Sequence, residues 1–193
     1  MRPQMSLVIA LVVVCASLTW RALAADTTVE FGPALGAKAP SFTLADQDGV
    51  KKSLAELVGE KGVVLVFFRS ADWCGYCRAQ LAQFGVSTKE IEKRGYKIAG
   101  ISYDKAEVLK RFHERRKLAF PLLSDQGSKT INAYGLRDAQ YRQGHFAYGV
   151  PHPVLLILDA KGTVKARLFE ANYEKRPPVP LLLQTLDNLE KSG

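Results

Sequence analysis

VLVFFRSADWCGYCR, residues 64–78, is the stretch that decides the fold. It opens on a continuous apolar run, which is typical of a strand covered on both faces. Beyond the turn, Ala79, Leu81 and Phe84 follow at helical spacing. The sequence therefore predicts a strand, a turn and a helix whose first turn carries Cys74 and Cys77.

Two residues separate the cysteines, so both sulfurs can share one helical turn and can bridge or separate with little backbone movement. The first sulfur can lie near the unpaired N–H groups and the positive end of the helix dipole, which favours a thiolate. A thiolate beside a partner thiol is what disulfide exchange requires. A structural disulfide and half of a zinc site are the alternatives at this point.

The chain of 193 residues suits one domain with a sizeable core. Apolar residues make up 47% of it, as in an ordinary globular protein. The net charge of +8 is dispersed along the sequence, without the aromatic interleaving of a nucleic-acid surface. We therefore expect these charges to serve solvation and expect no nucleic-acid partner.

The first residues have the pattern of a signal peptide, residues 1–24. Arg2 supplies the positive n-region, an apolar run follows from Leu7 to Leu18, and residues 22–24 read Ala-Leu-Ala, a cleavage pattern. We expect a mature domain of residues 25–193 in the bacterial periplasm, without stable membrane insertion; an uncleaved anchor is the alternative. Cleavage removes Cys15, so only Cys74 and Cys77 remain, in an oxidising compartment.

Later segments alternate between strand and helix patterns. We expect strands at Val63–Phe68, Tyr96–Tyr103, Val154–Leu158 and Thr163–Phe169. We expect helices from Cys74 to Arg94 with a bend or pause near Gly85, from Asp104 as N-cap to Lys117, at Ser128–Tyr134 and at Leu181–Lys191. Residues 137–153 form a long loop. This order predicts an α/β fold with a mixed sheet.

Four places in the chain resemble the thioredoxin-like superfamily and, within it, the redoxin group of alkyl hydroperoxide reductases and thiol-specific antioxidants (AhpC/TSA). They are residues 36–49, residues 66–78 with WCGYC, residues 100–136, and Pro153 with the strand and Asp-Ala-Lys-Gly that follow. The resemblance implies a three-layer fold: a central mixed sheet flanked by helices, with an N-terminal β-hairpin extension.

The resemblance also separates two enzymatic hypotheses. Peroxiredoxins of this group have a Pro-x-x-x-Thr/Ser-x-x-Cys site and a supporting arginine. With Cys77 as the peroxidatic cysteine, Ser70, Cys74 and Pro153 stand where the proline, threonine and arginine belong. Pro153 instead matches the cis-proline of thioredoxins, whose peptide pairs with the substrate backbone. This comparison favours thiol–disulfide exchange over peroxide reduction.

The leading hypothesis is thus an exported thiol–disulfide oxidoreductase in which Cys74 attacks and Cys77 resolves. The resemblance implies substrate binding by Trp73, His152 and Pro153, and His152 is a candidate for tuning the thiolate. We expect no cofactor besides the redox-active disulfide and no metal. The expected partners are protein thiols or disulfides and an electron-transfer partner that the sequence does not identify. A peroxiredoxin-like peroxidase and a CxxC/His metal-binding or chaperone module are the alternatives.

Overall fold

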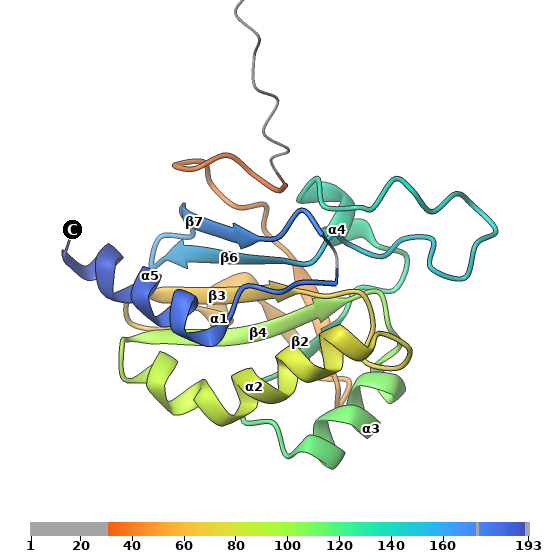
Figure 1. Ribbon diagram of the computed structural model, residues 1–193, viewed down its shortest axis with the longest axis horizontal. Helices are drawn as coiled ribbons and strands as arrows, with labels where there is room; N and C mark the ends of the chain where they lie inside the picture. The colour runs from red at the N-terminus through yellow and green to blue at the C-terminus, as the bar shows by residue number, and fades with distance from the viewer. Residues whose placement is uncertain (1–30, 173, 192–193) are drawn as a thin grey trace, which may run out of the picture.

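The computed structural model describes residues 31–172 and 174–191 of the chain (Figure 1). Its strands are β1 (Thr43–Asp46), β2 (Lys51–Ser53), β3 (Gly62–Phe67), β4 (Tyr96–Ser102), β5 (Leu122–Ser124), β6 (Val154–Asp159) and β7 (Val164–Phe169). Its helices are α1 (Leu54–Leu57), α2 (Gly75–Glu92), α3 (Ala106–Arg116), α4 (Lys129–Ala133) and α5 (Val179–Lys191).

The strands form one sheet in the order β2-β1-β5-β4-β3-β6-β7. The central neighbours β3, β4 and β5 run parallel, whereas β6, β7, β1 and β2 pair antiparallel with their neighbours. The sheet is therefore mixed, as predicted.

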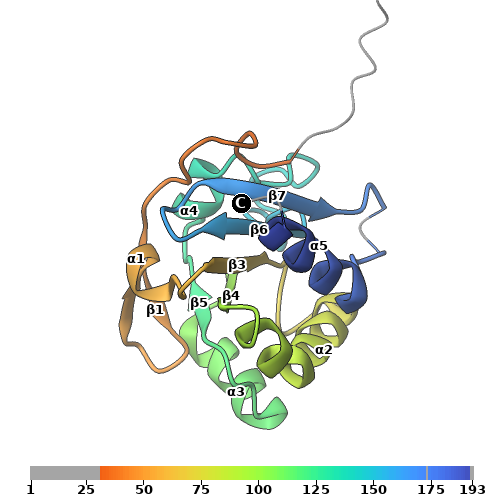
Figure 2. The same cartoon turned by 90° about the vertical axis from the view of Figure 1, so that its left-hand side faces the viewer.

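Strand β3 is buried along its whole length because both faces of the sheet are covered. Val64 and Val66 point into the core cluster shared with Leu81 of α2 and Leu182 of α5. The alternate residues Val63 and Leu65 belong to a second cluster on the opposite face, together with residues of α1 and α4. Figure 2 shows the resulting layers, with α2 and α5 on one side of the sheet and α1 and α4 on the other. The predicted three-layer α/β fold is confirmed.

The hairpin β1–β2 extends the sheet beyond β5. Its turn is closed by Asp46, whose Oδ1 accepts hydrogen bonds from the backbone N–H groups of Asp48 at 2.9 Å and Val50 at 3.0 Å. Such aspartate-centred turns are a common way to join two antiparallel strands. The N-terminal β-hairpin extension that the sequence predicted is therefore present.

Two helix predictions are wrong in detail. Helix α2 runs without a pause through Gly85. The glycine instead leaves room for Leu118, because a Cβ at this position would lie 2.7 Å from a Leu118 methyl. Asp104 does not cap α3, because the N-cap is Lys105, which makes no side-chain capping bond. Asp104 is buried instead. The short strand β5 was not predicted as a strand.

The predicted signal peptide, residues 1–24, and the expected start of the mature chain at Ala25 lie outside the described residues. Within the described part of the chain, no helix has the length and apolar character needed to cross a membrane.

Candidate active site

Cys74 and Cys77 are joined in a disulfide at the point where the loop after β3 enters α2. Cys74 is the N-cap of the helix, and its Sγ accepts a hydrogen bond from the backbone N–H of Cys77 at 3.2 Å. Cys74 is 5% exposed and Cys77 is fully buried. The two sulfurs therefore share the first helical turn, and Cys74 is the outer one.

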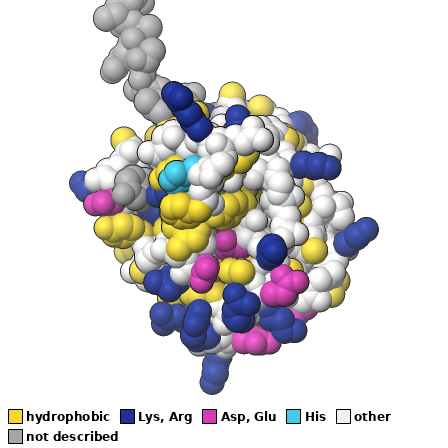
Figure 3. Space-filling view, turned by 90° about the vertical axis from the view of Figure 1, so that its right-hand side faces the viewer, with side chains coloured by type: hydrophobic (Ala, Val, Ile, Leu, Met, Phe, Trp, Pro, Cys, Tyr) yellow, Lys and Arg dark blue, Asp and Glu magenta, His cyan; other side chains and the backbone are white. Residues whose placement is uncertain are grey.

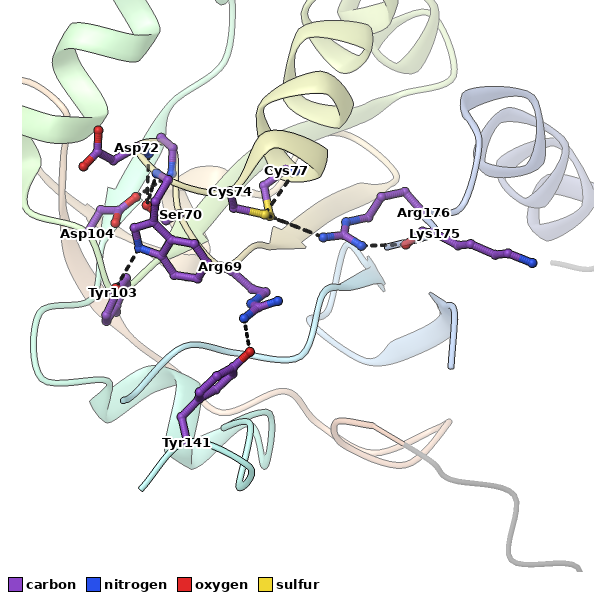
Figure 4. Close-up of a disulfide and its surroundings, with 12 residues drawn as sticks. Arg69, Ser70, Asp72, Cys74, Cys77, Tyr103, Asp104, Tyr141, Lys175 and Arg176 are labelled. Atoms are coloured by element: carbon purple, nitrogen blue, oxygen red, sulfur yellow. Dashed lines mark hydrogen bonds between the residues drawn. A yellow bond between two sulfur atoms is a disulfide. The ribbon is translucent and has the colours of Figure 1, made fainter. Parts of the chain in front are cut away.

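The loop that presents Cys74 is held from behind by Asp104, which follows β4. One carboxylate oxygen of Asp104 accepts a hydrogen bond from the backbone N–H of Ala71 at 2.7 Å. Ser70 Oγ in turn accepts from the backbone N–H of Asp72 at 3.0 Å. Burial raises the pKa of Asp104, and its hydrogen bonds with Ala71, Ser70 and Ser102 only partly oppose this. Figure 4 shows Asp104 and Ser70 together behind the loop. Sequence analysis missed this role.

The variant Asp104→Asn tests the raised pKa. A carboxyl group whose pKa is raised in the folded state contributes stability below its ordinary pKa of 3.8, and this contribution is lost as the pH rises through the folded pKa. We therefore expect the free energy of unfolding of the wild type, relative to that of Asp104→Asn, to fall in urea titrations as the pH rises from 3.8 toward neutrality. A constant difference over this range would contradict the raised pKa.

Trp73 ties the cysteine loop to the long loop of residues 137–153. Its indole N–H donates to the hydroxyl of Tyr103 at 3.0 Å, and that hydroxyl donates to the carbonyl of Phe146 at 3.1 Å. The Phe146 ring meets the indole edge-on at 5.3 Å between centroids. The loop of residues 137–153, here called the aromatic loop, therefore packs against Trp73, the residue before Cys74. Figure 3 shows hydrophobic side chains gathered on the face that lies on the right in Figure 1.

Arg69, two residues beyond the end of β3, is buried and contacts both Trp73 and the aromatic loop. Its guanidinium carbon lies 5.0 Å from the ring centroids of both Trp73 and Tyr141, and the group donates a hydrogen bond to the Tyr141 hydroxyl. Contacts of a cation with aromatic faces are favourable, more so when water is excluded. Arg69 thus fixes the positions of Trp73 and of the aromatic loop.

Arg176, in the segment between β7 and α5, lies close to both sulfurs. The Nη2 atom of Arg176 lies 3.4 Å from Cys77 Sγ and 3.8 Å from Cys74 Sγ. Its guanidinium carbon lies 6.0 Å from the ring centroid of Tyr76. Burial, and secondarily the charge of Arg69, lowers the pKa of Arg176 to about 10. Sequence analysis did not identify Arg176, and its flanking residues Lys175 and Pro177 carry no motif.

The prediction of a cis bond at Pro153 is wrong, because the described residues contain no cis peptide bond. The imidazole of His152 stacks on Phe31 at 4.0 Å between centroids, and its Nε2 lies 3.7 Å from Asp138. Burial is the main cause that lowers the pKa of His152. In residues 31–172 and 174–191, no hydrogen bond links His152 to either sulfur, so contact with the thiolate stays a prediction.

Among the residues that the structure describes, no three or more side chains of His, Cys, Asp and Glu are grouped as metal ligands. The set of Cys74, Cys77 and His152 on which the metal-binding alternative depends is therefore not assembled.

The chain matches the AhpC/TSA family over residues 35–167. It is 33% identical to peroxiredoxin Bcp of Escherichia coli (strain K12) over 127 residues, which cover 66% of this chain and 80% of that protein. It is 31% identical to the chloroplastic peroxiredoxin Q of Triticum aestivum, over 88% of this chain and 74% of that one. The crystal structure of peroxidoxin BcpB from Mycobacterium tuberculosis superimposes with a TM-score of 0.68 at 23% identity, covering 83% of this chain and 99% of that chain. The last comparison confirms the thioredoxin-like fold.

Proposed function

Since the chain belongs to the AhpC/TSA family of oxidoreductases, we propose that it is a thiol peroxidase whose complete redox pair is Cys74 and Cys77. Peroxide reduction is the alternative to thiol–disulfide exchange that the sequence leaves open. The similarity of the chain to proteins named peroxiredoxins supports the proposal. The observation that carries the proposal is the disulfide itself, since an attacking and a resolving thiol must lie close enough to bond, as Cys74 and Cys77 do.

The proposed reaction begins with the reduced pair. The Cys74 thiolate attacks one oxygen of the hydroperoxide, the O–O bond breaks, and Cys74 becomes a sulfenic acid while the other oxygen leaves as an alcohol or as water after taking a proton. Cys77 then attacks the sulfenic sulfur, a disulfide forms and water leaves. One peroxide is reduced and two thiols are oxidised. A dithiol reductant from outside the protein must then reopen the disulfide.

Two observations favour a small oxidant over a protein disulfide. Cys74 is only 5% exposed in the disulfide form, and a hydroperoxide needs less room beside the sulfur than a folded protein substrate does. The trans bond at Pro153 also removes the cis-proline geometry on which backbone pairing with a protein substrate was predicted. Both observations weaken the case for protein substrates.

The site nonetheless departs from the peroxiredoxin pattern. Ser70, Cys74 and Pro153 stand where that pattern has proline, threonine and arginine. Thiol–disulfide exchange with protein substrates therefore stays the second candidate function. The observation that favours it is the Trp-Cys-Gly-Tyr-Cys sequence at the start of α2, whose sulfurs share one turn as in disulfide-exchange enzymes. On this hypothesis, Trp73 and His152-Pro153 would contact the incoming peptide.

We further propose that the protein is exported. The basis is the signal-peptide pattern of residues 1–24, with residues 25–193 as the mature domain. The mass of the product recovered from the periplasm would show whether the chain begins at Ala25. A full-length chain in the membrane fraction would support the uncleaved anchor instead.

The proposed activity predicts a fixed stoichiometry. We expect the fully reduced protein, freed of other thiols and of oxygen, to lose two thiols for each hydrogen peroxide consumed and to recover the Cys74–Cys77 disulfide. Thiol titration and peptide mass spectrometry would measure both quantities. The double variant Cys74→Ser/Cys77→Ser is the control and should consume no peroxide. Reduced wild-type protein that leaves peroxide unchanged would overturn the proposal.

A further inference from the structure

Arg176 belongs to the segment between β7 and α5, and in Figure 4 its side chain points at the disulfide. The Nη2 atom is within hydrogen-bond reach of both sulfurs, at 3.4 Å from Cys77 and 3.8 Å from Cys74. A second guanidinium nitrogen, Nη1, donates to the backbone carbonyl of Lys175 at 2.6 Å. The guanidinium is thus held by the Lys175 carbonyl, and its Nη2 atom faces the sulfurs.

The guanidinium of Arg176 lies in a half-buried setting. Arg69 adds a like charge from the loop after β3, whereas Tyr76 from α2 offers the face of its ring. A hydrogen bond to an ionised acceptor is roughly twice as strong as one between neutral groups. The contact of Arg176 with the sulfurs is therefore stronger when a sulfur carries a negative charge than when both form the neutral disulfide. The arrangement is better matched to the open, negatively charged pair than to the disulfide.

We propose that Arg176 is a catalytic residue that stabilises the thiolate released when the Cys74–Cys77 disulfide opens. This inference rests on the redox use of the pair in the proposed function, but not on the identity of the oxidant. It holds equally if the pair is oxidised by a peroxide or by a disulfide.

The reductive step shows where the charge appears. A thiolate of the external dithiol attacks the outer sulfur of Cys74, the bond to Cys77 breaks, and the electron pair leaves on Cys77 Sγ. Cys77 is fully buried in the disulfide, so the negative charge forms on a sulfur that is shielded from water. The guanidinium lies 3.4 Å from this sulfur, while the helix N–H already serves Cys74. The second thiol of the reductant then displaces Cys74 as a thiolate, whose sulfur is also within reach of Arg176.

The test compares Arg176→Gln, Arg176→Lys and the matched control Lys175→Gln. The control removes a positive charge from the neighbouring residue, Lys175, whose side chain is exposed. The position of the dithiol–disulfide equilibrium would be measured in dithiothreitol redox buffers, and the pH titration of the thiols would be followed by thiolate absorbance. Neither measurement involves a peroxide.

Losing a hydrogen bond to a charged group shifts an equilibrium by roughly tenfold to a hundredfold. We expect Arg176→Gln to shift the dithiol–disulfide equilibrium toward the disulfide by that factor, which corresponds to about 30–60 mV. The midpoint of thiol ionisation should move to higher pH. Arg176→Lys should restore part of both effects, since it keeps the charge but loses the planar fork. Lys175→Gln should change neither.

The inference is overturned if Arg176→Gln leaves both the equilibrium and the thiol titration at their wild-type values, or if Lys175→Gln shifts them equally. Far-ultraviolet circular dichroism of each variant would verify the fold, and Arg176→Lys keeps the test valid if Arg176→Gln does not fold. A wild-type protein that ignores peroxide but shows the Arg176 effect would refute the proposed peroxidase and leave this inference standing.

Discussion

We expect Cys74→Ser to lose peroxide consumption by at least about a thousandfold, because the variant lacks the thiolate that attacks the peroxide. Cys74 is placed for this role by two features: its sulfur accepts the helix N–H of Cys77 at 3.2 Å, and it is the more exposed member of the pair. Cys77→Ser should still react with one peroxide, but the product should be a sulfenic acid on Cys74 that no second thiol resolves. Peroxide decay and trapping with dimedone before mass spectrometry would measure the two outcomes.

The thermal unfolding of both serine variants serves as the control for the fold, measured against wild-type protein in its reduced form. Roles opposite to those expected would appear as a sulfenic acid on Cys77 in the Cys74→Ser variant. That result would contradict the assignment of Cys74 as the attacking residue and would favour the alignment of Cys77 with the peroxidatic cysteine.

The largest expected loss of stability comes from Phe68→Ala. Phe68 is fully buried in the same core cluster as Cys74 and Cys77, directly after β3. Its ring also lies close to the backbone of β4, since a Cβ at Gly100 would come within 3.0 Å of it. Removing a buried phenylalanine side chain costs about 3–5 kcal/mol, which is a large part of the roughly 5–15 kcal/mol that holds a domain folded. Urea unfolding followed by circular dichroism would measure the loss.

Val86→Ala is the matched control for Phe68→Ala. Val86 lies on α2, the helix that carries the pair, but its side chain is 88% exposed. Its truncation should change the free energy of unfolding by no more than about 0.5 kcal/mol. If Phe68→Ala changed the free energy of unfolding as little as Val86→Ala, that result would contradict the packing of the Phe68 ring in the core between β3 and α2.

Local patterns made the centre of the fold predictable. The apolar run that forms β3 needs burial on both faces, and the apolar residues after the cysteines recur at helical spacing, so strand, turn and helix followed from adjacent residues. Asp104 shows the limit of this reasoning. An aspartate before a helical pattern is a good N-cap on propensity alone, yet here its carboxylate accepts the N–H of Ala71 from a loop 33 residues earlier in the sequence. Tertiary contact decided its role.

The remainder of the site depends on contacts that no local pattern encodes. Trans and cis X-Pro bonds differ by only about 0.5–1 kcal/mol, so the surrounding structure decides the isomer at Pro153. Arg176 meets Cys77 across a separation of 99 residues, from a segment with neither helical nor strand periodicity. The family resemblance therefore transferred a cis bond to Pro153, where the structure has a trans bond.

The measurement that tests the account most directly is a comparison of two rate constants for the reduced protein. Loss of thiols would be followed under pseudo-first-order conditions, once with hydrogen peroxide and once with a protein disulfide, at the same pH and salt. We predict that hydrogen peroxide reacts at least about tenfold faster, a difference of about 1.4 kcal/mol in activation free energy. A protein disulfide that reacts faster than peroxide would contradict the account and establish thiol–disulfide exchange as the function of the Cys74–Cys77 pair.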